Sequence, residues 1–201
     1  MNPSSPLPDR YAVLGHPVAH SQSPFIHAEF ARQTGERIAY GRIESPLDAF
    51  AATVDAFIAS ADPAAGLGPA RGCNITVPFK FQVLPLARRA SERALLAQAA
   101  NVLRFDADGW FADNTDGTGL VRDIQQQAGV PLAGQRVLLI GAGGAAAGVL
   151  GPLIEAGCAG VTVANRTPDK AHDLVQRHAD WARRHGVRLA ATGLADAGEG
   201  Y

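Results

Sequence analysis

The stretch that decides the fold runs Arg136-Val-Leu-Leu-Ile-Gly-Ala-Gly-Gly-Ala-Ala-Ala-Gly148. Its first five residues form a near-continuous apolar run, typical of a strand that is buried on both faces. The residues from 144 to 156 have the composition of a helix. A glycine-rich turn between a strand and a helix is the pattern that brings backbone close to a dinucleotide pyrophosphate.

Each small residue of this turn has a separate role. Gly141 permits the tight turn, Gly143 lets the backbone approach a pyrophosphate, and Ala146 allows close packing of helix on strand. The helix then presents free N–H groups and a partial positive charge to the phosphates. The alternative is a tight strand–helix turn that binds no ligand.

The end of the next strand indicates which dinucleotide. Residues 160–164 predict a strand that ends in Asn165-Arg-Thr167. In an NAD-binding protein, an acidic residue at this position would accept a hydrogen bond from the ribose 2′-hydroxyl, and no acidic residue is present. Arg166 can pair with a 2′-phosphate, which favours NADP(H) over NAD(H). Alternatively, Arg166 is merely solvated and Thr167 only caps the helix that Pro168 opens.

Strands and helices alternate on both sides of a Gly/Pro-rich break at residues 129–134, which predicts an α/β protein. We expect a disordered tail at 1–9, a substrate-binding and catalytic domain at 10–130, and an incomplete Rossmann-type NADP-binding domain at 131–201. The predicted strands are 10–15, 39–43, 72–77, 101–105, 110–112, 136–140, 160–164 and 187–191. The predicted helices are one that Ser23 caps, with Pro24 first, and that runs to residue 33, one opened by Ser45-Pro46, 91–100, 119–127, 144–156 and one opened by Thr167-Pro168.

Composition excludes several classes of protein. The 201 residues carry 18 basic and 19 acidic side chains, so the chain lacks the basic surplus of a nucleic-acid or anionic-membrane binder. No apolar run approaches the roughly 20 residues of a membrane span. The first residues lack a signal-peptide pattern, and two cysteines are too few for a disulfide framework or a cysteine zinc site. We expect a cytoplasmic protein with no metal site.

Polar side chains gather in the first part of the chain where a plain core would not need them. Ser21 and Ser23 lie at a helix start, where hydroxyls can bind a carboxylate. Asn74 and Thr76 alternate with apolar residues at the carboxyl end of a strand, and such ends bind ligands in α/β sheets. The other members are Lys80, Asn101 and the Asn114-Thr-Asp-Gly117 segment.

Taken singly, these residues have plainer explanations: helix capping, a solvated lysine and turn chemistry. Taken together, one Lys and one Asp beside neutral hydrogen-bonding groups suit a small polyhydroxylated acid. The chain has 16 Arg and only two Lys, Lys80 and Lys170. A lysine suits proton transfer better than an arginine, because its pKa can move toward neutrality.

At these residues the chain resembles the shikimate dehydrogenase family. The match lies in six segments that occur in the family's order: Ser21-Gln-Ser23, Asn74-Ile-Thr-Val-Pro-Phe-Lys80, Ala100-Asn101, Asp113-Asn-Thr-Asp-Gly117, Gly141-Ala-Gly-Gly-Ala145 and Asn165-Arg-Thr167. The resemblance implies a two-domain α/β enzyme that reversibly reduces 3-dehydroshikimate to shikimate with NADPH, on the way to chorismate and the aromatic amino acids. Its site would lie in the cleft between the domains, and a homodimer stays open.

The resemblance also implies a role for each matched residue. Lys80 and Asp116 would be the catalytic pair, with Lys80 moving the proton at the C3 oxygen. Ser21 and Ser23 would hold the carboxylate. The remaining expected contacts are Asn74, Thr76 and Asn101 for ring hydroxyls, and Gly141, Gly143, Gly144, Ala145, Asn165, Arg166 and Thr167 for the cofactor.

Two departures keep other functions open. The segment Ala145-Ala-Ala-Gly148 lacks the Ser and Arg that relatives often carry, which leaves Arg166 as the main phosphate reader. About 70 residues follow the Gly/Pro break, and they supply two or three predicted strands, whereas a full dinucleotide-binding fold has six. We therefore expect a C-terminally truncated family member. The alternatives are a quinate/shikimate dehydrogenase with relaxed cofactor use and a non-catalytic shikimate-binding paralogue.

Overall fold

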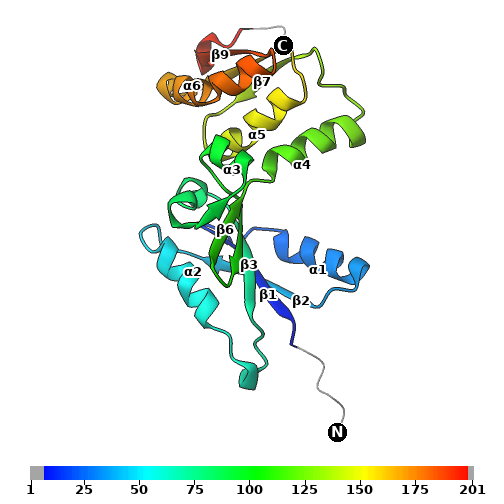
Figure 1. Ribbon diagram of the computed structural model, residues 1–201, viewed down its shortest axis with the longest axis vertical. Coiled ribbons are helices and arrows are strands. Elements are labelled where there is room, and N and C mark those ends of the chain that lie inside the picture. Colours follow the sequence, from blue (N-terminus) through cyan, green and yellow to red (C-terminus); the bar gives the residue numbers. More distant parts are fainter. Residues whose placement is uncertain (1–6, 199–201) are drawn as a thin grey trace. The chain divides into compact units, whose positions relative to one another are not determined.

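The computed structural model describes residues 7–198 and divides them into two compact α/β units (Figure 1). The first unit runs to Ala90 and includes Asn101–Ala112. The second comprises Ser91–Ala100 and the chain from Asp113 onward. These contact-based units do not coincide with the expected division between residues 130 and 131. That division separates a substrate-binding domain from an NADP-binding domain, and it stays a prediction. Of the expected tail, residues 1–6 lie outside the described residues, and Asp9 already belongs to a strand.

The first unit contains one six-stranded sheet, in the order β2-β1-β3-β5-β6-β4. β1 is parallel to both β2 and β3, whereas β3 and β5 are antiparallel. The strands are β1 Asp9–Gly15, β2 Ile38–Glu44, β3 Ala70–Ile75, β4 Arg89–Ala90, β5 Val102–Asp106 and β6 Gly109–Asp113. The helices of this unit are α1 Ser23–Thr34 and α2 Phe50–Ala59.

The strand order places the two helices on opposite faces of the sheet, as Figure 1 shows. β1 lies between β2 and β3, so the crossover through α1 moves to one side of β1 and the crossover through α2 returns to the other. Below α2, the rings of Phe50 and Phe79 stack with centroids 5.0 Å apart. Leu14, Val54 and Ile75 complete this core and are 0–2% exposed.

The second unit has a three-stranded parallel sheet in the order β7-β8-β9. Its strands are β7 Arg136–Ile140, β8 Gly160–Asn165 and β9 Arg188–Gly193. Its helices are α3 Glu92–Ala97, α4 Asp116–Arg122, α5 Gly144–Glu155 and α6 Pro168–Arg184, and α4 continues as a π-helical turn over Asp123–Gln127. The alternation of strand and helix confirms the α/β prediction.

The core of the second unit lies between α5, α6 and the sheet. Leu150, Ile154 and Leu174 are fully buried there, together with Val163 of β8. The prediction that 136–140 is buried on both faces is wrong, because β7 is an edge strand of the described sheet and Ile140 is 65% exposed. In the described part of the chain, no helix is both long and apolar enough to cross a bilayer.

Three predicted helix starts need correction. Gln22, not Ser23, occupies the N-cap position of α1, and Ser23 is the first helical residue. Ser45-Pro46 does not open α2, which begins at Phe50. The buried Ser45 hydroxyl instead pairs with Thr53 Oγ1 at 3.0 Å. α4 begins at Asp116, three residues before the predicted start, so Asp116-Gly117 is helical rather than part of a turn.

Candidate active site

The serine pair and the Asn74–Lys80 segment follow two neighbouring parallel strands. Ser21 and Ser23 follow β1, and Thr76 and Lys80 follow β3. The His16 N–H donates to the Val77 carbonyl at 2.9 Å, and a Cβ at Gly15 would overlap the Thr76 methyl. The carboxyl ends of β1 and β3 thus bring both segments to one edge of the sheet, where open α/β sheets bind ligands.

The two serines contact each other at the start of α1. Ser21 Oγ lies 3.1 Å from Ser23 Oγ and accepts a hydrogen bond from the Ser23 N–H at 3.3 Å. The Gln22 side chain, at the N-cap position, makes no capping hydrogen bond, and the helix dipole favours a carboxylate at this N-terminus. Both serines are half-buried, which leaves part of each hydroxyl accessible.

Asn74 is held by groups on both sides of β3. Its Oδ1 accepts a hydrogen bond from Tyr40 Oη at 2.6 Å, and its Nδ2 donates to the Asn101 carbonyl at 3.3 Å. The same carbonyl accepts the Ile75 N–H at 2.8 Å. The structure therefore brings Asn74 and Asn101 together, as expected if both serve one ligand.

Tyr40 is a residue of this site that the sequence analysis missed. Its hydroxyl is the donor to Asn74, and its ring packs against α1. The His27 ring stacks on the Tyr40 ring with centroids 4.0 Å apart, and His27 Nδ1 donates to the Ser23 carbonyl at 2.8 Å. Burial raises the pKa of Tyr40 well above its usual range, so the phenol stays protonated at neutral pH. Only the alternation of β2 could have indicated that Tyr40 faces α1.

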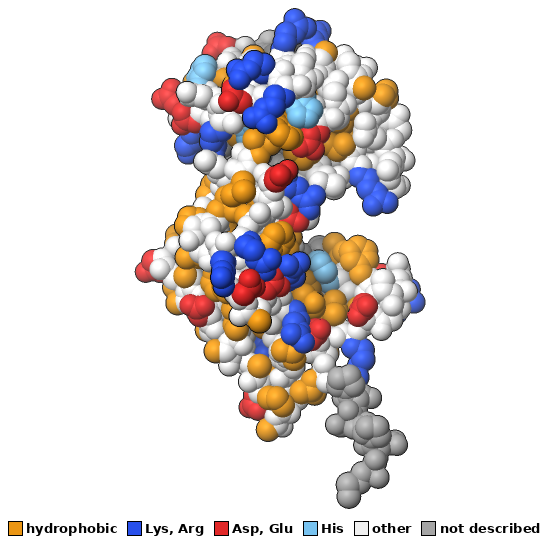
Figure 2. All heavy atoms as spheres, in the orientation of Figure 1, with side chains coloured by type: hydrophobic (Ala, Val, Ile, Leu, Met, Phe, Trp, Pro, Cys, Tyr) orange, Lys and Arg blue, Asp and Glu red, His pale blue; other side chains and the backbone are white. Residues whose placement is uncertain are grey.

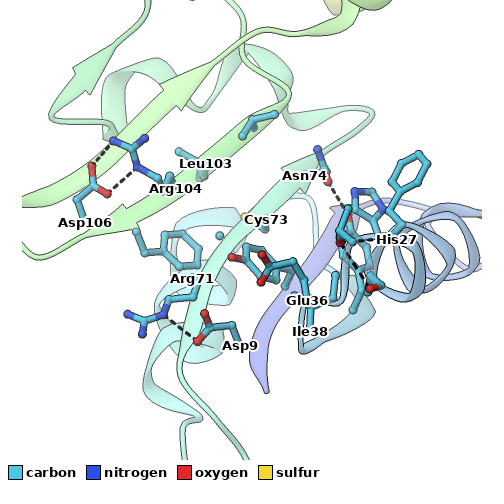
Figure 3. Close-up of a pocket in the computed structure, with 18 residues that line it drawn as sticks. Asp9, His27, Glu36, Ile38, Arg71, Cys73, Asn74, Leu103, Arg104 and Asp106 are labelled. Atoms are coloured by element: carbon cyan, nitrogen blue, oxygen red, sulfur yellow. Dashed lines mark hydrogen bonds and ion pairs between the residues drawn. The ribbon is translucent and has the colours of Figure 1, made fainter. Parts of the chain in front are cut away.

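A cavity of about 720 Å³ lies between α1 and this face of the sheet (Figure 3). His27, Tyr40 and Asn74 line one end, and the far end holds ion pairs of Arg71 with Asp9 and of Arg104 with Asp106. The lining is mostly apolar apart from these groups.

On the face that Figure 2 presents, basic and acidic side chains are interspersed, in agreement with the balanced net charge.

Lys80 lies in a single 3₁₀ turn, Phe79–Phe81, directly after β3. Phe79 is fully buried against Phe50 and anchors the turn, whereas Lys80 is half-buried. This arrangement fixes the backbone below Lys80 and leaves its long side chain room to reach a ligand. Lys80 belongs to the first unit and Asp116 to the second.

Asp116 begins α4 directly after a hydrogen-bonded segment, Asp113–Thr115, of the second unit. The Asp113 carboxylate accepts hydrogen bonds from Ser91 Oγ, from Nε and Nη2 of Arg93 and from the Asn114 N–H. Buried Asn114 donates to the Ala99 carbonyl at 2.9 Å and accepts the Asp116 N–H at 3.2 Å. Burial alone would raise the pKa of Asp113, but these donors outweigh it and lower that pKa. Asp116 therefore starts α4 from a fixed backbone.

The glycine turn has the geometry that a bound phosphate needs. Gly141 has φ = +106°, which a side chain would strain, and open space lies beyond the Cβ positions of Gly141 and Gly143. No side chain caps α5, so its first-turn N–H groups lack that partner. Ala146 is buried, as close packing of the helix requires. These observations fit a dinucleotide pyrophosphate at Gly141, Gly143, Gly144 and Ala145.

The residues after β8 are arranged less simply than expected. Thr167 occupies the N-cap position of α6, but its hydroxyl makes no capping hydrogen bond, so the prediction of a hydroxyl cap is wrong. Asn165 Nδ2 donates to the Thr167 carbonyl at 2.8 Å and shapes the turn. Arg166 and Thr167 are exposed. Both side chains are accessible to a ligand.

Within the described residues, His, Cys, Asp and Glu form no group of three that could hold a metal ion. The turn between β7 and α5, on a parallel sheet, defines a dinucleotide-binding α/β class of protein, and the first unit carries a cluster of polar side chains at one edge of its sheet. Comparison with known proteins narrows this class to one family.

The family model "Shikimate dehydrogenase substrate binding domain" matches residues 13–103, and "Shikimate / quinate 5-dehydrogenase" matches residues 123–190. The shikimate dehydrogenase (NADP(+)) of Methylibium petroleiphilum is 65% identical over 96% of this chain. That of Paracidovorax citrulli is 55% identical, again over 96% of the chain. The chain belongs to the shikimate dehydrogenase family.

Solved structures agree with this assignment. The Thermus thermophilus shikimate 5-dehydrogenase in complex with NADP(H) and shikimate is 33% identical, covers 90% of this chain and has a TM-score of 0.74. An Ael1 enzyme from Pseudomonas putida is 44% identical over 90% of the chain, with a TM-score of 0.75. This chain spans 65% and 66% of the lengths of the two curated relatives, and 62% and 63% of the two solved chains.

Proposed function

We propose that this chain carries the substrate-binding and adenosine-side residues of an NADP-dependent shikimate dehydrogenase. The reaction is the reversible reduction of 3-dehydroshikimate to shikimate. The observation that carries the proposal is the meeting of the Ser21–Ser23 pair and the Asn74–Lys80 segment at the carboxyl ends of β1 and β3. The relative from Thermus thermophilus, whose fold this chain shares, is described as a complex with NADP(H) and shikimate.

The substrate would be held by complementary polar groups. Ser21 and Ser23, at the start of α1, would donate to the carboxylate. Asn74, Thr76 and Asn101 would bind the ring hydroxyls, because their amide and hydroxyl groups both donate and accept. Fixing one carboxylate and several hydroxyls holds the reacting carbon in one orientation, which is a large part of catalysis.

The cofactor site fits NADP(H). Gly141, Gly143, Gly144 and Ala145 would hold the pyrophosphate, and Asn165, Arg166 and Thr167 the adenosine ribose with its 2′-phosphate. The bound nicotinamide would supply the hydride. Reduction of a ketone also consumes one proton at the oxygen. Lys80 would deliver that proton and remove it in the reverse direction, while Asp116 would hydrogen-bond the substrate and orient the proton.

The test of this proposal is a pair of substitutions at Lys80. We expect Lys80→Ala and Lys80→Arg each to lower NADPH oxidation with 3-dehydroshikimate by at least about 10²-fold, because arginine keeps the charge but does not release a proton. NADPH binding should change less than about twofold in both, since Lys80 is not among the proposed cofactor contacts.

Three other outcomes are informative. Equal loss of turnover and NADPH binding would contradict the role of Lys80. Binding of shikimate and NADPH without turnover in the unmodified chain would favour a non-catalytic binding protein. Oxidation of quinate as fast as shikimate, with NAD as well as NADP, would favour the quinate/shikimate alternative.

A further inference from the structure

Tyr40 lies between groups that the proposed function assigns to two different parts of the substrate. Its hydroxyl donates to Asn74, whose amide contacts the Asn101 carbonyl. Its ring stacks on His27, which bonds to the Ser23 carbonyl, and Ser23 contacts Ser21. A chain of hydrogen bonds therefore runs from the phenol through Asn74 to Asn101, and His27 links the same ring to the serine pair.

The direction of each hydrogen bond in this chain is determined by one fixed acceptor. The Asn101 carbonyl can only accept, so the Asn74 group that faces it, 3.3 Å away, must be the NH₂. The Asn74 group that faces Tyr40 is then the amide oxygen, which also only accepts. The Tyr40 hydroxyl must donate to that oxygen, at 2.6 Å.

The donors in this chain therefore point one way, from Tyr40 through Asn74 to the Asn101 carbonyl. If the Tyr40 hydroxyl were absent, the Asn74 oxygen would lose its donor. Of these two hydrogen bonds, the longer one, to the Asn101 carbonyl, would then be left to hold the amide, which would be fixed less firmly.

The Tyr40 ring is itself held in place. His27 stacks on it with an interplanar angle of 13°, and the His27 hydrogen bond to the Ser23 carbonyl fixes the imidazole. Burial keeps the phenol protonated, so it remains a donor at neutral pH. A phenylalanine would preserve the ring, the stacking and the packing against α1, and would remove only the hydroxyl.

We infer that Tyr40 is a positioning residue, resting on the proposed function: its hydroxyl holds the Asn74 amide in the orientation that is preset for one hydroxylated carboxylic acid. Tyr40 does not have to touch the substrate for this. Its effect is transmitted through Asn74, so it should appear in substrate affinity and not in the chemical step.

Tyr11 provides a matched control. It lies directly opposite Tyr40 in the β1–β2 register and lines the same cavity. None of the hydrogen bonds that fix Asn74 or the serine pair in the described part of the chain comes from Tyr11. Tyr11→Phe and Tyr40→Phe therefore remove the same atom from neighbouring positions on one face of one sheet.

The experiment measures two properties of the whole chain. In the ligand-free protein, NMR of the Asn74 side-chain amide should show shifted NH₂ resonances in Tyr40→Phe and unchanged ones in Tyr11→Phe. In calorimetric titration with shikimate, Tyr40→Phe should weaken binding about tenfold, as expected for one hydrogen bond, and Tyr11→Phe less than twofold. Where turnover is measured, KM for shikimate should rise and kcat should change less than about twofold.

Each result decides a different claim. An unchanged Asn74 amide signal in Tyr40→Phe, or equal effects of both substitutions, would overturn the inference. A loss in kcat with KM unchanged would also overturn it, because it would place Tyr40 in the chemical step. A shifted Asn74 signal in a chain that does not bind shikimate would uphold the orienting role of Tyr40 and count against the proposed function.

Discussion

Arg166 is the residue on which the proposed choice of cofactor depends. It is exposed at the end of β8, in the place where an NAD-binding protein would have an acidic reader of the ribose hydroxyl. An arginine cannot accept a hydrogen bond from a ribose hydroxyl, but its guanidinium matches a phosphate in shape and charge. Neighbouring Ala145–Gly148 provides no second basic group.

We therefore predict that Arg166→Ala weakens NADPH binding by roughly 10- to 100-fold, the value of one charge-assisted phosphate contact. NADH, which lacks the 2′-phosphate, should lose less than about threefold. Fluorescence titration with both nucleotides measures the difference, and Arg177→Ala, another α6-side arginine, is the control. Equal weakening of NADPH and NADH would show that Arg166 does not read the phosphate.

The sequence indicates candidate site residues more readily than it indicates their local contacts. The Ser, Asn, Thr and Lys candidates stand out because they lie at or after strand ends, which are readable from apolar patterns, and their roles stay predictions. Tyr40 was missed because its role depends on Asn74, which is 34 residues away in the chain. Ser23 and Thr167 were assigned as caps from residue type alone, yet capping depends on a backbone geometry that residue type does not determine.

At the scale of elements, the close approach of α4 and the residues before it to α5 depends on two glycines, Gly117 and Gly148. A Cβ at Gly117 would lie 2.5 Å from the Gly148 carbonyl oxygen and 2.6 Å from Pro152 Cγ. A Cβ at Gly148 would likewise lie 2.6 Å from the Asn114 amide. These contacts are with backbone and with a buried, hydrogen-bonded side chain, which cannot move away. Gly119, in the same helix, has open space at its Cβ position.

Gly117→Ala should therefore lower the free energy of unfolding by about 2 kcal/mol or more, as overpacking does. Gly119→Ala should raise it by up to ~1 kcal/mol, because alanine is the better helix former. Urea denaturation of both variants measures these changes. Two substitutions of the same sign and size would mean that helix propensity, and not the contact with α5, decides.

The connection between β6 and α4 should also make the second unit sensitive to acid. Hydrogen bonds lower the pKa of Asp113 in the folded state below its value in the unfolded chain. This carboxylate therefore stabilises the fold fully above the unfolded pKa, and the stabilisation is lost as pH falls through the folded pKa. Arg93→Ala removes the strongest of these donors and should raise the Asp113 pKa, so that destabilisation begins at a higher pH.

Carbon-detected NMR titration of the Asp113 carboxyl group measures that shift directly. Acid denaturation of the same two proteins measures its effect on stability, with the Arg93→Ala midpoint expected at higher pH. An Asp113 titration midpoint that does not move in Arg93→Ala would contradict the role assigned to this ion pair. Sequence patterns could not indicate this ion pair, because Ser91 lies 22 residues and Arg93 lies 20 residues from Asp113 along the chain.

At the scale of the whole molecule, the alternation of apolar runs and helical patterns was sufficient to predict two α/β units. The domain division expected at the Gly/Pro break near residue 130 stays a prediction. The contacts group the chain in another way, with Asp113 onward and the earlier segment Ser91–Ala100 in the second unit. Local composition marks a loop but does not reveal that a segment such as α3 packs on a helix some 50 residues further on.

The division into two units leads to a test of the proposal as a whole. The proposed substrate contacts lie in the first unit except for Asp116, and the proposed cofactor contacts lie in the second. A ligand that binds only the folded form stabilises the region that contacts it, by about 2.7 kcal/mol at a hundredfold excess over Kd. In hydrogen exchange, shikimate should therefore slow the amides of β1, β3 and the start of α1. NADP should slow those of Gly141–Ala147 and of the β8–α6 turn. Protection by both ligands confined to one unit would refute this assignment of residues to two ligands, and so would protection by shikimate of the β7–α5 turn alone.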